Sequence, residues 1–568
     1  MKQLQIDKKS WNACLFMIIG VCLSVSTKGQ SVYAPINQDY AHLVKRYEIK
    51  HGRFLNRLHT QLQPYSRKYI ALLADSLSAN NTDLSRQDKF NLMYLKNDNW
   101  EWSESADNDA KKPFLRYFLD KKSDFYHYRD DDFEVHLNPV LGVGASLERG
   151  DASATRYLNS RGAELRGMIS KKVGFYTFFT DNQAVFPTYV NNEITRLNAV
   201  PNEGFYKQGL GEEKVDFITA RGYITFDVIK NISLQFGHDK NQIGPGYRSL
   251  ALSDYSNNYL FLKLNTNVWK INYQNIFGQL TAEVLNADGL RPKKYFATHH
   301  LSVNLSKNFN IGLFETVMFA RNDTVSTNGS SGNFDFNYLN PIIFYRSAEQ
   351  QLGSPDNALL GMDFKWNFLK RFSLYGQLVI DEFVISEVRS GNGWWGNKQA
   401  GQIGLTYIDV LGVDNLDIQG EVNIVRPYMY RHNFRYRNFT NYNQALAHPI
   451  GANFYEFIGI ARYQPIPRLN LAAKVLYTRY GADANGSNWG KDIFTNQTFQ
   501  QEFGNRIAQG IETNLIFANF NASYQLRHNM FLDLHATFRQ ESNELATTRN
   551  LVGGLTFRWN IARRIYEF

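Results

Sequence analysis

The stretch LNLAAKVLYTRY, residues 469–480, alternates apolar and polar side chains over much of its length. Leu469, Leu471 and Val475 fall on one face and Lys474 on the other, because successive side chains of a β-strand point to opposite faces. A lysine at the midplane of a lipid-facing wall would cost ~2–4 kcal/mol. Lys474 is therefore expected to face a wet interior, with the apolar residues facing lipid.

The same period of two recurs from Phe133 onward over roughly four hundred residues. Short turns such as 306–308 and 527–529 alternate with long loops. The long loops are predicted at 183–213, 240–257, 320–334, 386–400, 426–452 and 481–504. Short turns at one end and long loops at the other are typical of an outer-membrane barrel. Residues 131–568 are predicted to form a transmembrane antiparallel up-and-down β-barrel, which makes the chain mainly all-β.

Composition fits this fold class. Aromatic residues make up 15% of the chain, and the mean hydropathy of −0.41 excludes a bundle of membrane-spanning helices. A barrel with an apolar outer face and a polar lumen has such an average, and so does a secreted β-protein. The predicted hairpins and an export signal favour the barrel over a soluble sandwich. A solenoid would need a fixed repeat, and none is found.

Residues 1–29 are predicted to be a cleaved signal peptide. A basic start with Lys2, Lys8 and Lys9 precedes the apolar run 11–25, and small residues place the cut near Gly29. Both cysteines of the chain lie within this segment, so the mature protein would have no disulfide. Cleavage would lower the net charge from +9 to +6, without a concentrated basic segment. Nucleic acid is therefore not an expected partner.

Residues 30–130 are predicted to be a mainly helical periplasmic region. Tyr69, Leu73 and Leu77 recur at helical spacing. The segment Ser85 to Asp88 resembles a capping box with Asp in place of Glu. A further helix is predicted at Phe114–Leu119, after a proline suited to a helix start.

The last predicted strand, 551–560, is followed by a terminal aromatic residue, Phe568. Outer-membrane assembly machinery tends to read a terminal aromatic after an alternating strand. The barrel-assembly machinery is therefore an expected partner, and Phe568 is expected to be its signal.

Short motifs occur in order between residues 237 and 451 and resemble the capsule assembly Wzi family. They are Gly237-His238-Asp239, Ile243-Gly244-Pro245-Gly246, Ser249-Leu250, His299-His300-Leu301, Gly312-Leu313-Phe314-Glu315, Tyr338-Leu339-Asn340-Pro341, Gly353–Asn357, Asp381-Glu382-Phe383, Arg426-Pro427-Tyr428 and Leu446–Gly451. More narrowly, the chain looks like the Bacteroidota branch that includes proteins labelled gliding motility protein RemB. The resemblance implies eighteen strands, helical elements at the periplasmic end and a role in holding surface polysaccharide.

The Gly-Pro-Gly loop of this family often carries tryptophans, and here those positions are Gln242, Ile243 and Tyr247. Proline and its flanking glycines end the preceding strand. The loop is interpreted mainly as architecture, either an inward constriction or an outward rim, with direct ligand contact as the alternative. Its residues are Gly244, Pro245, Gly246, Tyr247 and Arg248.

The loop 426–448 is the preferred candidate for glycan contact. Its arginines can pair with acidic sugars or phosphates, and its aromatic rings can stack on sugar faces. The candidate residues are Arg426, Tyr428, Tyr430, Arg431, Arg435, Tyr436 and Arg437. The alternative is a structural loop folded into the barrel, with its arginines paired to lumen carboxylates. The same loop would also suit lipopolysaccharide headgroups.

Trp394 and Trp395 lie among glycines in GNGWWGNK and offer a second stacking surface. An aromatic girdle at the membrane interface is the alternative.

Catalytic and metal signatures are weak. Asp381-Glu382 and His299-His300 are adjacent pairs, so their side chains are expected to point to opposite faces of a strand. Asp130-Asp131-Asp132 lacks the rest of a calcium loop. No metal or cofactor is expected, and no nucleophile motif is found.

The favoured function is therefore non-enzymatic binding or anchoring of surface polysaccharide, in capsule or slime assembly or in gliding and adhesion. The expected partners are this polysaccharide or lipopolysaccharide, the outer-membrane bilayer and, for gliding, the motility or secretion machinery. A porin-like channel for small or anionic solutes is the alternative. An enzyme in the barrel wall is a third hypothesis, to which the sequence lends no motif.

Overall fold

The computed structural model describes residues 31–568 with twelve gaps, and the structural statements below refer to these residues. The gaps are 81–82, 112–117, 151–153, 210–212, 284–290, 321–333, 343, 353–355, 383, 434, 484–485 and 496–497. The predicted signal segment with both cysteines lies outside the described residues, as do most of the predicted helix 114–119 and part of the 353–357 motif.

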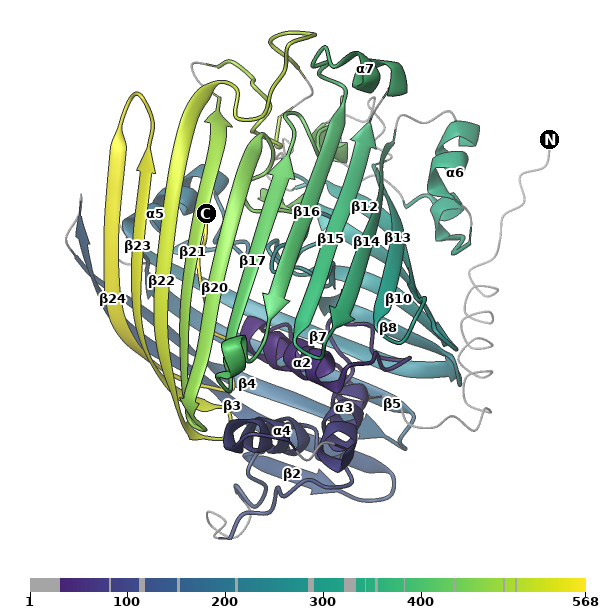
Figure 1. The fold of residues 1–568 in the computed structure, drawn as a ribbon, viewed down its shortest axis with the longest axis vertical. Coiled ribbons are helices and arrows are strands. Elements are labelled where there is room, and N and C mark those ends of the chain that lie inside the picture. Colours follow the sequence, from purple (N-terminus) through teal and green to yellow (C-terminus); the bar gives the residue numbers. More distant parts are fainter. Residues whose placement is uncertain are drawn as a thin grey trace.

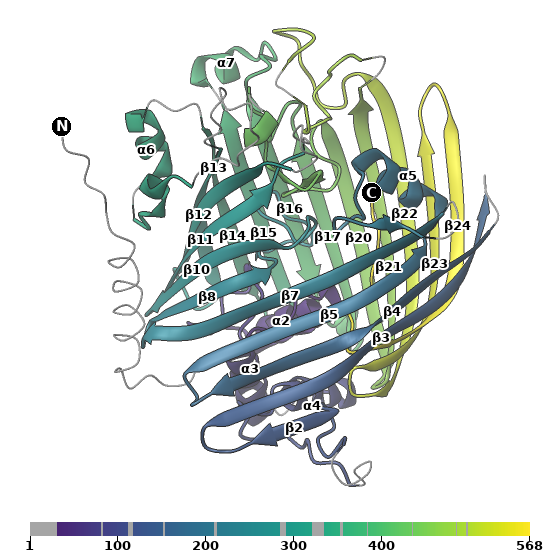
Figure 2. The same ribbon diagram turned by 180° about the vertical axis from the view of Figure 1, so that it is seen from behind.

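Eighteen antiparallel strands form a closed barrel in the described chain, as predicted (Figures 1 and 2). Sequential strands are neighbours, and β24 pairs with β3 to close the barrel. The strands are β3 (Phe133–Gly150), β4 (Ala154–Ile169), β5 (Val173–Val185), β7 (Lys214–Ile229), β8 (Ile232–Asp239), β10 (Tyr259–Val268), β11 (Ile271–Thr281), β12 (Lys293–Asn304), β13 (Phe309–Phe319), β14 (Asn357–Phe368), β15 (Phe372–Glu382), β16 (Lys398–Tyr407), β17 (Leu416–Val425), β20 (Phe454–Ile466), β21 (Leu469–Ala482), β22 (Ile511–Arg527), β23 (Met530–Ser542) and β24 (Thr547–Trp559).

Strand β21 confirms the alternation from which the barrel was predicted. Val475 is half-exposed on the outer wall, whereas Lys474 is buried in the lumen. Short turns gather at one end of the barrel, here called the turn end, and the long connections lie at the opposite loop end (Figure 1).

One predicted boundary was wrong. Residues 506–514 and 517–527 were expected to be two strands, but β22 is a single strand from Ile511 to Arg527. The adjacent apolar pair Leu515-Ile516 breaks a simple alternation. Leu515 is buried in the lumen and Ile516 is exposed on the outer wall.

Three helices close the turn end and form what we call the plug: α2 (Gln38–His51), α3 (Arg67–Asn80) and α4 (Arg86–Asp98) (Figures 1 and 2). The predicted capping box is confirmed, since Ser85 and Asp88 exchange hydrogen bonds at the start of α4. Helix α2 was missed. It buries Arg46 and Glu48 in addition to apolar residues, so its sequence lacks a clean apolar stripe.

Buried ion pairs fasten the plug to the barrel wall. Arg46 of α2 lies 2.5 Å from both Asp409 and Asp417, and 3.3 Å from Asp88 of α4. Glu48 of α2 pairs with Lys365 of β14. Each charge is matched in a site that excludes most water, and this matching is what makes burial of charged groups tolerable.

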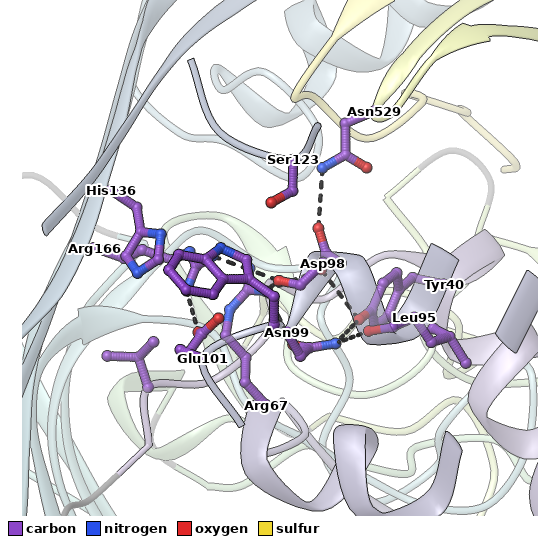
Figure 3. A network of polar contacts seen from close by, with 12 residues as sticks. Tyr40, Arg67, Leu95, Asp98, Asn99, Glu101, Ser123, His136, Arg166 and Asn529 are labelled. Carbon is purple, nitrogen blue, oxygen red and sulfur yellow. Dashed lines mark hydrogen bonds and ion pairs between the residues drawn. The ribbon is translucent and has the colours of Figure 1, made fainter. Parts of the chain in front are cut away.

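A second set of contacts joins the plug to β3, β4 and the β22–β23 turn (Figure 3). Asp98 pairs with Arg67 at 2.9 Å and accepts a hydrogen bond of 3.0 Å from Asn529. Arg166 of β4 pairs with Glu101 just after α4. The plug is thus held on opposite sides of the barrel.

His59, between α2 and α3, makes plug docking sensitive to pH. The ring is buried, and its Nδ1 lies 2.7 Å from Ser302 Oγ of β12. Burial lowers the pKa of His59 from 6.5 to about 4. Its stabilising contribution is therefore complete above pH 6.5 and is lost as the pH falls toward 4.

We expect plug docking to weaken over this pH range, by at most about 3 kcal/mol. Limited proteolysis of α2–α4 between pH 4 and 7 measures the effect. His59→Gln, which cannot titrate, should reduce this pH dependence without abolishing it, because burial also lowers the pKa of His42 in α2 to about 4. His51→Gln in the same plug is the control and should leave the profile as in the wild type. An unchanged profile in His59→Gln would contradict this assignment.

Smaller elements occupy the loops and the lumen. They are α5 (Thr188–Leu197), α6 (Tyr345–Leu352), α7 (Ile385–Ser390), η1 (Phe336–Leu339), η2 (Val410–Gly412), η3 (Arg435–Arg437), β1 (Leu62–Gln63), β2 (Tyr126–Arg129), β6 (Lys207–Gln208), β9 (Gln242–Ile243), β18 (Thr440–Asn441) and β19 (Gln444–Ala445). Among the described helices, none has the length and apolar character to cross a membrane.

Candidate functional site

The Gly-Pro-Gly loop folds into the lumen and meets the plug. β9, just before Gly244, pairs with β1 of the plug region. Lys45 of α2 donates to the carbonyls of Pro245 and Gly246, at 2.9 and 3.2 Å. Burial lowers the pKa of Lys45 to about 7. The loop is thus an inward constriction rather than a rim.

Tyr247 and Arg248 continue this constriction onto the barrel wall. Their backbone N–H groups donate to Glu421 of β17, at 2.6 and 3.0 Å. The Arg248 guanidinium lies 3.3 Å from Glu456 of β20. Through these contacts, Tyr247 and Arg248 hold the Gly-Pro-Gly loop against the barrel wall, which is a structural role.

The segment after β24 turns back into the lumen. Glu567 accepts from Tyr247 at 2.7 Å and pairs with Lys474 of β21. Burial alone would raise the pKa of Glu567, but Lys474 and Arg248 outweigh it and hold the pKa below its usual range. Residues 561–566 separate two cavities of about 150 and 320 Å³.

Phe568 follows the last strand, as expected, and lies inside the lumen. β24 stops at Trp559, and Phe568 is buried beside Tyr189 of α5 and Tyr255. The reason is that nine residues follow the strand and find polar partners inside the barrel. Arg539, for example, donates to the Phe568 carbonyl at 2.9 Å.

The Arg–aromatic loop is divided between buried and accessible residues. Tyr430 is buried: its hydroxyl donates to the Leu250 carbonyl at 2.8 Å, and its backbone N–H donates to Asp381 at 2.9 Å. Arg431 is buried and donates to Asn488 and Thr495, at 2.6 and 2.8 Å. Tyr428 is likewise buried. In this conformation these three side chains offer no surface to a glycan.

The remaining candidates of this loop lie nearer solvent. Tyr436 and Arg437 of η3 are half-buried, and Arg426 is half-buried at the end of β17. Arg437 lies 3.4 Å from Asp356, which also accepts from Tyr338 at 2.6 Å. The backbone of Arg435 belongs to η3. Phe434 lies outside the described residues.

The tryptophan pair packs against the same loop. Trp395 stacks on Phe499 with centroids 4.7 Å apart and meets the edge of Tyr428 at 6.4 Å. Trp394 lies 5.6 Å from Trp395. Both tryptophans are half-buried. The two candidate stretches thus meet where Trp395 contacts Tyr428. We use the name mouth cluster for the loop-end aromatic and arginine residues that keep part of their surface exposed: Trp394, Trp395, Tyr436, Arg437 and Phe499.

Sequence reasoning missed Phe499, Asn488 and Thr495, which all lie in the loop 483–510. That loop carries no motif of its own, and its contacts with 426–448 arise only from the closed barrel. The adjacent histidines behave as expected, whereas at Asp381-Glu382 the pairing with β16 is irregular between Ile380 and Glu382. His300 faces the lumen and Asp363, while His299 faces outward and Glu315, so they do not share a metal site.

A protein-family model of the capsule assembly protein Wzi matches residues 143–550. The chain belongs to the Wzi family. The match spans the barrel from β3 to β24, including the Gly-Pro-Gly constriction and the mouth cluster. The search of curated protein sequences returns no match.

Among solved structures, the Wzi-family barrel is similar to Wzi of Escherichia coli, described as a carbohydrate-binding β-barrel involved in group 1 capsule assembly. The TM-score is 0.55 at 12% identity, covering 94% of this chain and all of the other. OccK8 (OprE) of Pseudomonas aeruginosa gives a TM-score of 0.39 at 10% identity, covering 75% of this chain and 98% of the other. OccAB4 of Acinetobacter baumannii gives 0.39 at 9%, covering 76% and 98%. The low scores of these two support no statement about this chain.

Proposed function

We propose that this Wzi-family barrel binds surface polysaccharide at its loop end and anchors it to the outer membrane during capsule assembly, without catalysis. The observation that carries the proposal is the mouth cluster, whose aromatic rings and Arg437 keep part of their surface exposed at the loop end. Aromatic faces can stack on sugars, and a guanidinium can pair with acidic substituents. The description of Escherichia coli Wzi as carbohydrate-binding supports the same assignment.

The proposal also includes a more specific ligand, a role in motility and a route to the membrane. Lipopolysaccharide offers the same sugars and phosphates, and gliding or adhesion in a Bacteroidota cell would use the same loop-end surface. Export by the predicted signal peptide and insertion by the barrel-assembly machinery complete the proposed route to the outer membrane.

A porin-like channel is the second candidate function. The segments that fill the lumen argue against an open channel. The plug, the Gly-Pro-Gly constriction and the segment after β24 are all held inside the barrel by buried polar contacts. Purified protein in planar bilayers separates the two functions. Large steady conductance would favour the channel.

Replacing Trp394 and Tyr436 with Ala should weaken glycan retention. Each stacking contact is worth about 0.5–1.5 kcal/mol, so each replacement should reduce affinity about two- to tenfold. The measurement is polysaccharide retained on intact cells, with a deletion strain complemented by each variant. Phe205→Ala removes an exposed loop-end aromatic outside the mouth cluster and is the matched control.

Arg431→Ala serves a different purpose, because Arg431 is buried. It should reduce retention only as far as it disorders the loop. If the Trp394 and Tyr436 variants reach the surface and retain glycan like the wild type, the mouth cluster is not the site.

A further inference from the structure

The β13–β14 connection lies against the outside of the barrel wall. Figures 1 and 2 show α6 outside β12 and β13 near the loop end, in both opposite views. We name this region the outer flange and define it as η1 (Phe336–Leu339), Asn340–Ile342, Phe344 and α6 (Tyr345–Leu352).

Beneath the flange, the outer wall carries an ionisable pair. His299 of β12 and Glu315 of β13 are cross-strand neighbours, and their side chains lie 3.1 Å apart. Both point outward, because their neighbours His300 and Phe314 point into the lumen. A carboxylate on the lipid-facing side of a barrel is unfavourable unless it is covered and hydrogen-bonded.

The flange supplies that cover. The backbone N–H groups of Tyr345 and Arg346, at the start of α6, donate to the two Glu315 oxygens at 2.8 and 2.7 Å. The Tyr345 ring stacks on His299 with centroids 4.5 Å apart. Tyr273 of β11 donates to the Pro341 carbonyl. Glu315 thus fixes the flange to the wall.

Apolar packing completes this attachment. Tyr338 and Tyr345 are fully buried in a cluster with outward-facing residues of β11, β12 and β13. The cluster members on the wall are Phe277, Ala297, Val317 and Phe319. The side of the flange that carries Tyr338 and Tyr345 therefore packs on the barrel wall.

The flange exposes large apolar side chains in the described chain, alongside the polar residues Asn337, Asn340, Arg346 and Ser347. Phe336, Ile342 and Phe344 are 73%, 82% and 71% exposed. They belong to a segment that packs on the outward wall of β11–β13, and on that wall Leu313 is 53% exposed. Large apolar side chains exposed together on one short segment indicate a contact surface.

We propose that the outer flange inserts Phe336, Ile342 and Phe344 among the acyl chains of outer-leaflet lipids. The occupant follows from continuity: the flange extends a wall that faces lipid, at the loop end, where the outer leaflet lies. This inference rests on the proposed membrane placement of the barrel and goes beyond glycan binding.

Single-cysteine variants of the full chain test the proposal, in a background with Cys14→Ser and Cys22→Ser. Phe344→Cys, Leu313→Cys and Phe205→Cys are labelled with an environment-sensitive fluorophore and reconstituted in vesicles containing lipids brominated on their acyl chains. Leu313 reports the wall, and Phe205 reports an exposed loop-end position. We expect quenching at 344 to match that at 313 and to exceed that at 205 at least twofold.

Glu315→Gln tests the attachment, because an amide cannot accept from both backbone N–H groups without turning a donor toward one of them. Quenching at 344 should fall at least twofold in this variant, while quenching at 313 should stay. Asp363→Asn is the matched control, since the His300–Asp363 pair at 2.6 Å lies on the lumen side of the same wall.

The outcomes are distinguishable. Absent quenching at 313 would overturn the membrane placement itself. Quenching at 313 but not at 344 would overturn the lipid contact of the flange alone. Disulfide cross-linking of unlabelled Phe344→Cys between copies, with no quenching at 344, would assign this surface to a second copy of the chain instead.

Discussion

Arg46→Leu is expected to release the plug from the barrel. Arg46 is buried and faces three carboxylates, those of Asp88, Asp409 and Asp417. Leucine removes the guanidinium and, among the described residues, leaves Lys50 as the cation paired with this acidic cluster. Removing one partner of a buried ion pair costs ~3–5 kcal/mol, because the other charges stay buried without compensation.

Limited proteolysis measures this release directly, since α2–α4 should become cleavable while the barrel strands stay protected. Arg46→Lys keeps the charge but loses the planar fork that reaches two carboxylates at once, so its effect should be intermediate. Protection of α2 equal to that of the wild type in Arg46→Leu would show that apolar packing alone holds the plug.

Removal of residues 561–568 is expected to open the lumen. This segment separates the two lumen cavities, so its loss joins them into one space. It also removes Glu567, the carboxylate partner of Lys474, so the lumen loses one of its buried ion pairs. Arg248 keeps Glu456, so the constriction loses only part of its support.

Planar-bilayer conductance should rise several-fold in the truncated protein. Glu567→Gln is the matched control, because it removes the charge while the segment still fills the lumen, and it should conduct less than the truncation. Heat-modified mobility on gels establishes that each variant has a folded barrel. Conductance of a folded truncation equal to that of the wild type would mean that the plug and the constriction close the lumen without this segment.

The barrel could be predicted from sequence because its rule is local. Lys474 and Val475 follow from a period of two, and Ser85 with Asp88 marks the start of α4 within four residues. Each of these signals depends on neighbours in the chain. The boundary error at β22 came from Leu515, which packs inside the lumen next to an outward-facing Ile516.

The interior could not be predicted in this way. Arg431 is buried because Asn488 and Thr495 reach it from another loop, and a run of arginines and aromatic residues does not reveal such partners. Phe568 had a plausible role as a terminal signal, yet the residues before it find Lys474 and Arg248 in the lumen. Helix α2 was not predicted for the same reason, since its buried Arg46 is stabilised by carboxylates that lie far away in the sequence.

Asp356 contacts both the outer flange and the mouth cluster. One of its oxygens accepts from Tyr338 of the outer flange, and the other faces Arg437 of the mouth cluster. Thermodynamic linkage is reciprocal. If a ligand that draws Arg437 away from Asp356 changes the free energy with which Tyr338 packs on the wall, then the packing of Tyr338 changes the binding free energy of that ligand by the same amount. With glycan at the mouth cluster and lipid at the outer flange, as proposed, the composition of the surrounding membrane and the occupancy of the mouth cluster would be coupled variables in this barrel.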